Sequence, residues 1–231
     1  TGPPADPRKM LYERGFRESP LAADATLDVA RPWVILGADR GLASALRERL
    51  EAAGARVTTL VPGDAFACAG ENRFDVRPDS REDLGAALAA SVATGGGRAI
   101  RVLHLGSVTG SSGPHNSAQA FEDAARTGFF SLVALTQAAY DRNLDDGLEV
   151  TVVADGLAQL EGETNVRFAE KAAVLGACRD IPLELPGVRV RVVDVPCFDA
   201  AGAPAWLPDP LLREAGAGDA PALARPRPAA R

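Results

Sequence analysis

Five apolar runs recur along the chain, and the segments between them have helical spacing. The runs are 32–38 (PWVILGA), 56–63 (RVTTLVPG), 100–107 (IRVLHLGS), 148–156 (LEVTVVADG) and 188–196 (VRVRVVDVP). Runs of this kind are typical of strands that are buried on both faces of a parallel sheet. Right-handed crossovers join such strands through helices. The chain is therefore predicted to be α/β, with a Rossmann-like doubly wound, mainly parallel sheet and helices on both faces.

Four segments carry the helical spacing or the start signal of a helix. They are 41–54, 80–95, 117–140 and 165–185. In the first of them Leu42, Leu46 and Leu50 fall on one helical face. The second begins with Ser80, a residue type that caps helix N-termini. Upstream, the alternation in 10–19 (MLYERGFRES) predicts one more short strand.

Proline, alanine and glycine dominate both ends of the chain, where no apolar period is found. Such compositions are typical of linkers. We therefore expect a linker over 1–9, one domain over 10–198 and a Pro/Ala-rich linker over 199–231. The length of 231 residues suits a single α/β domain. Linker-like ends indicate a piece of a longer polypeptide.

Charge and hydropathy exclude two classes of partner. The formal net charge of −6 is opposite in sign to the basic surface that nucleic acids require, so we expect no nucleic-acid binding. No apolar run approaches the roughly 18 residues that a membrane span needs, and acidic side chains interrupt the first thirty residues. We therefore expect no membrane contact and a cytoplasmic protein.

The cysteines and histidines indicate no metal site. Cys68, Cys178 and Cys197 are too scattered for a disulfide framework or a C-x-x-C metal site, and we expect reduced, mostly buried thiols. His104 and His115 lack metal-ligand partners at helical spacing. His104 lies in an apolar run and is expected to be a core or strand-end histidine. His115 is expected to be a polar loop residue.

The turn after the first apolar run bears on dinucleotide binding. Such a turn needs glycines because the pyrophosphate lies against backbone N–H groups at a helix N-terminus. Of the G-x-x-x-G-x-G pattern, Gly37 and Gly41 are present and Ala43 replaces the last glycine. Asp39 adds a negative charge, so we expect no cofactor binding by this chain and a vestigial turn kept for folding. The residues at the end of the second run do not distinguish NAD from NADP: Pro62, Gly63 and Asp64.

The segment 166–176 (VRFAEKAAVLG) resembles the catalytic helix of a short-chain dehydrogenase/reductase, where a tyrosine lies four residues ahead of a lysine. Here Arg167 stands at the tyrosine position and Lys171 at the lysine position. Arginine stays protonated at physiological pH and cannot serve as the general acid. The segment 103–107 lacks the family's asparagine and 152–162 lacks its serine. We therefore predict no catalytic residues, and interpret Arg167 and Lys171 as vestigial positions.

Residues in and near that helix are also expected to have structural roles. Lys171 is expected to be a surface lysine on a packing helix. A face of small residues is expected to let the helix pack closely on its neighbour: Ala172, Ala173, Gly176 and Ala177. Asp194, at the end of the last run, is expected to bond to neighbouring backbone.

The order and spacing of the segments resemble the structural subdomain of the ketoreductase region in modular polyketide synthases, over roughly residues 10–198. The most specific parts are the opening segment with Tyr12 and Phe16 and the closing stretch VLGACRDIPLELPGVRVRVVDV. In that family the ketoreductase is a pseudodimer of two Rossmann-like halves. The first half is degenerate and binds no cofactor, whereas the second binds NADPH and holds the Ser, Tyr and Lys.

The resemblance implies that this chain alone is inactive and scaffolds a catalytic half or adjacent domains of the same synthase during polyketide biosynthesis. NADPH would then bind to the partner catalytic subdomain. The long segment 117–140 is the expected contact surface for that partner or for self-association. Two alternatives stay open: an atypical NADPH-binding reductase that uses Gly37, Gly41 and Lys171, and a nucleotide sensor of the same fold.

Overall fold

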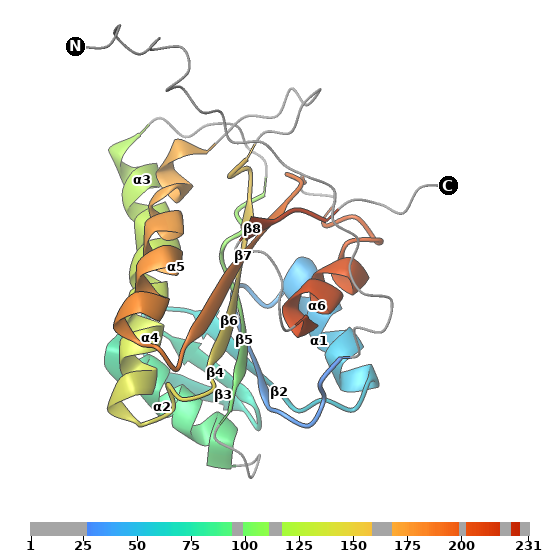
Figure 1. Cartoon of the computed structure of the whole chain (residues 1–231), viewed down its shortest axis with the longest axis vertical. Helices are drawn as coiled ribbons and strands as arrows, with labels where there is room; N and C mark the ends of the chain where they lie inside the picture. The colour runs from blue at the N-terminus through green and yellow to red at the C-terminus, as the bar shows by residue number, and fades with distance from the viewer. Residues whose placement is uncertain are drawn as a thin grey trace, which may run out of the picture.

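The computed structural model describes residues 27–93, 99–110, 117–158, 168–198, 202–217 and 223–226. These residues form one eight-stranded sheet with helices on both faces, as Figure 1 shows. The strands are β1 (Trp33–Leu36), β2 (Val57–Pro62), β3 (Ala67–Gly70), β4 (Arg73–Val76), β5 (Arg101–Ser107), β6 (Glu149–Asp155), β7 (Arg189–Val195) and β8 (Leu223–Ala224). The helices are α1 (Leu42–Ala52), α2 (Arg81–Ala93), α3 (Ala118–Ala124), α4 (Ser131–Asp141), α5 (Ala173–Glu184) and α6 (Pro208–Gly216).

The strand order is β3-β4-β2-β1-β5-β6-β7-β8, and every neighbouring pair except β3 and β4 is parallel. The five apolar runs correspond to β1, β2, β5, β6 and β7. The predicted Rossmann-like fold class is confirmed. No helix in the described part of the chain is long and apolar enough to cross a membrane.

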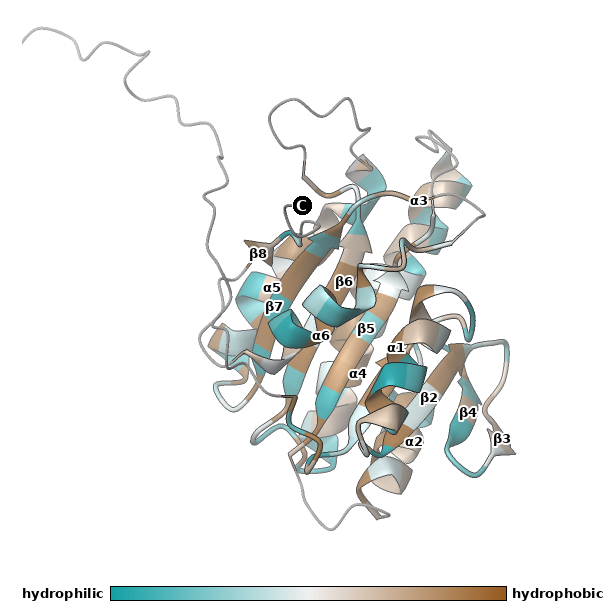
Figure 2. Cartoon of the chain, turned by 90° about the vertical axis from the view of Figure 1, so that its right-hand side faces the viewer, coloured by the Kyte–Doolittle hydropathy of each residue, from teal (hydrophilic) through white to brown (hydrophobic). Residues whose placement is uncertain are grey.

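Each face of the sheet has its own apolar core. Val34 and Leu36 of β1 belong to the core beneath α2, α4 and α5, whereas Trp33 and Ile35 belong to the core beneath α1 and α6. This division follows from the strand geometry, in which successive side chains point to opposite faces. Figure 2 looks onto the α1 and α6 side and shows hydrophobic strands behind the polar outer surface of α6. Burial on both faces explains why the strand sequences are continuously apolar.

The long predicted helix over 117–140 is divided into three parts. Helix α3 is followed by a π-helical turn, η2 (Ala125–Phe130), and then by α4. A Cβ at Gly106 would lie 1.9 Å from the carbonyl oxygen of Thr127, so the close approach of β5 and η2 requires glycine there. The predicted helix over 165–185 comprises a 3₁₀ turn, η3 (Ala169–Lys171), and α5. Residues 165–167 lie outside the described part.

The connection from β2 to β4 contains a strand where a doubly wound fold usually has a helix. Strand β3 pairs antiparallel with β4 at the edge of the sheet, and its four residues are exposed. Phe66 stacks on Phe74 with ring centroids 5.9 Å apart. The sequence did not predict β3 or β4, because neither forms an apolar run.

The expected linker over 199–231 is corrected in part by the structure. Helix α6 and strand β8 lie within it, and α6 buries Leu211 and Leu212 against the core that it shares with α1. Its apolar residues are too few to give a clear period among prolines and alanines. The predicted linker over 1–9 and the predicted strand over 10–19 lie outside the described residues.

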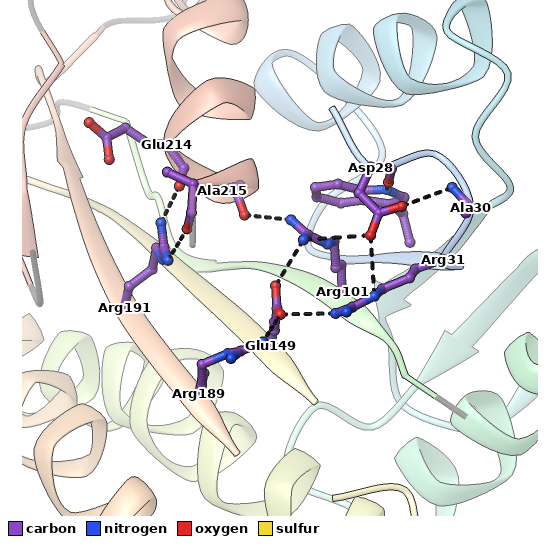
Figure 3. A network of polar contacts seen from close by, with 11 residues as sticks. Asp28, Ala30, Arg31, Arg101, Glu149, Arg189, Arg191, Glu214 and Ala215 are labelled. Carbon is purple, nitrogen blue, oxygen red and sulfur yellow. Dashed lines mark hydrogen bonds and ion pairs between the residues drawn. The ribbon is translucent and has the colours of Figure 1, made fainter. Parts of the chain in front are cut away.

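An arginine network fixes the C-terminal end of α6 to the strands (Figure 3). Arg101 Nη1 donates to the carbonyl oxygen of Ala215 at 3.0 Å. Arg191 donates to the carbonyl oxygens of Glu214 and Ala217. The last carbonyls of a helix lack intrahelical partners, so cationic donors at this end are stabilising.

Glu149, at the start of β6, is the shared acceptor of this network. It accepts from Arg31 at 2.9 Å, pairs with Arg101 at 3.2 Å and accepts from Arg189. Burial alone would raise the pKa of Glu149, but the hydrogen bond from Arg189 and the charges of Arg101 and Arg31 bring it below its usual value. The network thus joins the segment before β1, the starts of three strands and α6.

Removing the charge of Glu149 is expected to weaken this junction. Glu149→Gln should lower the free energy of unfolding by about 1–2 kcal/mol, because several charge-assisted hydrogen bonds lose their anion. Urea denaturation followed by circular dichroism measures the change. The matched control is Glu48→Gln on the exposed side of α1, which should leave stability nearly unchanged. Equal effects of the two substitutions would show that the network contributes nothing.

Candidate functional site

The residues of the glycine turn between β1 and α1 pack against neighbouring parts of the protein. A Cβ at Gly37 would lie 2.8 Å from Cβ of Leu105, so the neighbouring strand requires glycine at this position. Gly41 has φ 58°, a backbone conformation that favours glycine. Ala43 is buried in the core beneath α1. All three turn residues therefore have roles in folding.

Asp39, in the same turn, is held by two arginines. Its carboxylate lies 2.6 Å from Arg73 of β4 and 3.7 Å from Arg47 of α1. The carboxylate of Asp39 is thus neutralised by two partly exposed guanidinium groups. A dinucleotide pyrophosphate needs close backbone approach at such a turn, and the methyl group of Ala43 stands where the pattern has its last glycine, so the absence of cofactor binding stays a sequence-based prediction.

Lys171 corrects the expectation of a surface lysine. It lies in η3 with a side chain only 2% exposed, and its Nζ pairs with the carboxylate of Asp155, which is fully buried at the end of β6. Nζ also donates to the carbonyl oxygen of Asp155 at 3.1 Å and lies 4.2 Å from the ring centroid of Phe168. The backbone N–H of Thr109 donates to the same carboxylate at 3.1 Å. The lysine is thus bonded inside the protein.

Asp194 forms the second buried ion pair at this edge of the sheet. Its carboxylate accepts from the backbone N–H groups of Leu157 at 2.9 Å and Ala158 at 3.1 Å, which confirms the expected bonding to neighbouring backbone. Arg225 donates to it at 2.9 Å. Burial raises the pKa of Asp194, although these donors act in the opposite direction. The sequence gives no signal for this role of Arg225, because the residue lies in the predicted linker over 199–231.

These two ion pairs lie at the carboxyl ends of β6 and β7. Open α/β sheets bind their ligands at the carboxyl ends of the strands. Here Asp155 and Asp194 pair with Lys171 and Arg225 and also accept from backbone N–H groups, whereas Oδ2 of Asp155 has no hydrogen-bond partner among the described residues. Arg167 and residues 159–166 lie outside the described part of the chain, so the position of the missing tyrosine stays a sequence-based prediction.

His104 is a core histidine, as expected. It is fully buried on β5, and its Nε2 lies 2.6 Å from Oγ of Ser131. Since the Ser131 hydroxyl donates to the carbonyl oxygen of Thr127, Nε2 carries the proton and donates to Ser131. Burial lowers the pKa of His104 to about 4. The ring is therefore neutral near pH 7. His115 lies outside the described residues.

The cysteines differ from the expectation of mostly buried thiols. Only Cys178 is buried, whereas Cys68 is exposed on β3 and Cys197 is partly exposed. Burial raises the pKa of Cys178 to about 12 and also raises that of Cys197. Raised pKa values disfavour the thiolate, which is the reactive form. Among the described residues, no group of three or more His, Cys, Asp or Glu side chains could hold a metal ion.

Fold and site together define a class: a Rossmann-like chain in which Lys171 is bonded internally and the glycine turn between β1 and α1 is packed. Over residues 32–199 the chain matches the family described as beta-ketoacyl synthase-like, N-terminal, and it belongs to that family. A comparison with curated protein sequences finds no match.

Several solved structures share the fold. One is an adenylation, ketoreductase and pseudo-Asub multidomain structure of a keto acid-selecting NRPS module, with a TM-score of 0.80 and 20% identity over 94% of this chain. Another is an N-terminal ketoreductase from the macrolactin assembly line, with a TM-score of 0.59 and 17% identity over 79% of this chain. The chain spans only 17% and 35% of these two proteins.

A short-chain dehydrogenase/reductase from Brucella ovis, in complex with a partially ordered NAD, has a TM-score of 0.52 and 19% identity. The match covers 80% of this chain and 90% of that protein. At these identities the likeness shows the fold alone. The expected resemblance to ketoreductase regions and to short-chain dehydrogenases is confirmed at that level.

Proposed function

We propose that this chain is a non-catalytic structural subdomain of a polyketide synthase ketoreductase region, which scaffolds a catalytic half that binds NADPH. The observation that carries the proposal is the buried pair of Lys171 and Asp155. A lysine that serves a reductase site must reach the cofactor and substrate, whereas this one is bonded to the protein. The chain's role is then to contact other domains.

The outer sides of α4 and α5 supply the surface that this proposal needs. Phe130 of η2 and Tyr140 of α4 are 54% and 58% exposed, and Leu183 of α5 is 79% exposed. The small residues Ala172, Ala173 and Gly176 are also exposed, and a Cβ at Gly176 would meet nothing within 4 Å. Of the predicted small-residue face, Ala177 is buried in the core that α5 shares with α4, whereas these three residues do not pack within the described part of the chain, contrary to expectation.

Large apolar side chains on η2, α4 and α5 and small residues at the start of α5 are therefore exposed, and exposed apolar surface is typical of protein contact sites. Helices α4 and α5 lie side by side in Figure 1. The occupant that we propose is the catalytic half of the same ketoreductase region. Self-association through 117–140 is the alternative occupant, which sedimentation of the isolated chain distinguishes.

Calorimetric titration tests the scaffold role. We expect no heat of NADPH binding with the chain alone, and NADPH binding with ketone reduction once the catalytic half is added. Micromolar binding by the chain alone would contradict the proposal and favour the alternative of a reductase or nucleotide sensor. Failure of the chain to change the activity or stability of the catalytic half would contradict the scaffold role itself.

Surface variants locate the contact. Phe130→Asp combined with Tyr140→Asp should abolish association with the catalytic half while leaving the fold intact, because both side chains are exposed. The matched control is Phe66→Asp, an exposed aromatic residue beside β3 at the edge of the sheet. Equal loss of association in both variants would exclude the α4 and α5 surface.

A further inference from the structure

At the carboxyl ends of β6 and β7, the carboxylate of Asp194 and the carbonyl oxygen of Ala158 bind an arginine from the C-terminal segment. We call these acceptors, together with the adjoining edge of β7, the slot. Arg225 Nη1 donates to Asp194 Oδ2 at 2.9 Å and to the carbonyl oxygen of Ala158 at 2.7 Å. The side chain of Arg225 is only 3% exposed. The residues just before it add β8 to the edge of the sheet, parallel to β7.

The acceptors of this slot are fixed by the fold. The backbone N–H groups of Leu157 and Ala158 bond to the two carboxylate oxygens of Asp194, so the carboxylate cannot rotate away. The carbonyl oxygen of Ala158 adds a third acceptor close by. Charged and uncharged acceptors held in a rigid arrangement suit the planar guanidinium, which donates in fixed directions.

The strand edge supplies the second element of recognition. Leu223 pairs with Val192, and Ala224 pairs with Val193. Extended peptides bind sheet edges in this manner, with backbone pairing for affinity and side-chain sites for specificity. Neither the acceptors for arginine nor the strand edge requires that the bound peptide belong to the same chain. The resident segment benefits from a high effective concentration, because it is tethered through α6.

From these contacts we infer that the slot is a docking site for extended peptide segments that carry arginine. Residues 223–226 are its resident occupant, and a segment of the same chemistry from a second polypeptide can replace them. This site is separate from the surface of α4 and α5, and it does not depend on the scaffold role.

A fluorescent peptide with the sequence of residues 220–228 (APALARPRP) tests the inference by anisotropy. The protein is the full chain with Arg225→Ala, which releases the resident side chain. The peptide should bind this variant at least tenfold more tightly than it binds the unsubstituted chain, where the resident segment competes. Equal affinity for the two proteins, or no binding to the variant, would overturn the proposal.

Two controls identify the slot. A peptide in which alanine replaces the arginine corresponding to Arg225 should lose at least tenfold in affinity, and so should the intact peptide toward the chain with Asp194→Asn and Arg225→Ala. Unchanged affinity in either control would overturn the proposal. If the Arg225→Ala variant does not fold, the unsubstituted chain serves instead: excess spin-labelled peptide should broaden the amide signals of Leu157 and Ala158, and the alanine peptide should not.

Discussion

Asp155→Asn and Lys171→Met are each expected to lower the free energy of unfolding by about 3–5 kcal/mol, because each leaves one charge of a buried pair without its partner. Both side chains are nearly inaccessible to solvent. In Asp155→Asn the ammonium group keeps only uncharged partners among the described residues: the backbone carbonyl oxygen, the amide oxygen of the new side chain and the ring of Phe168. In Lys171→Met the carboxylate keeps only the N–H of Thr109 among the described donors.

The double variant distinguishes a charge effect from a packing effect. With Asp155→Asn and Lys171→Met together, no unpaired charge is left in the site, so the double variant should be more stable than either single variant. Urea denaturation at pH 7 gives all four free energies of a double-mutant cycle. Losses that simply add would show that the two charges are not coupled.

An exposed ion pair provides the matched control. Arg81 and Asp141 pair on the surface between α2 and α4, with about half of each side chain exposed. Asp141→Asn should destabilise far less than Asp155→Asn, because solvent screens the charge that remains. A comparable loss at both sites would mean that burial does not determine the effect.

The same pair shows what sequence analysis could predict of the site. The sequence alone predicts the replacement of the tyrosine by Arg167 and the loss of the serine and asparagine, because each concerns one position in a known pattern. The fate of Lys171 cannot, since it depends on Asp155 sixteen residues earlier and on the turn η3 that brings them together. A sequence shows that a residue type is missing from a pattern, but it does not show which partner a retained residue bonds to.

The elements of the fold also differ in how well the sequence predicts them. Strands such as β1 and β6 were predictable because burial on both faces makes their sequences continuously apolar. Strand β3 is exposed at the edge and has no such pattern. Helix α6 is held partly by Arg101, which lies 114 residues away from the carbonyl group of Ala215 that it binds. Long-range polar contacts of this kind leave no local signal.

Acid is expected to destabilise the fold through His104. Burial lowers its pKa from 6.5, the ordinary value of a histidine in an unfolded chain, to about 4 in the folded chain. Between these values the unfolded chain binds more protons, so stability falls as the pH falls below 6.5. The loss is about 1.4 kcal/mol per pH unit and reaches about 3 kcal/mol at pH 4.

The measurement uses a background in which His115→Gln leaves His104 as the sole histidine. Urea denaturation at several values between pH 7 and 4.5 gives the slope, and the same series with His104→Gln added gives the reference. Glutamine retains an N–H donor for Ser131 but does not titrate. Carboxylates contribute equally to both series, so their effect cancels in the difference. Parallel pH profiles would mean that protonating His104 costs no stability and that the ring is open to solvent. Profiles that separate below pH 6.5 would place the acid sensitivity of the fold at the contact between β5 and α4.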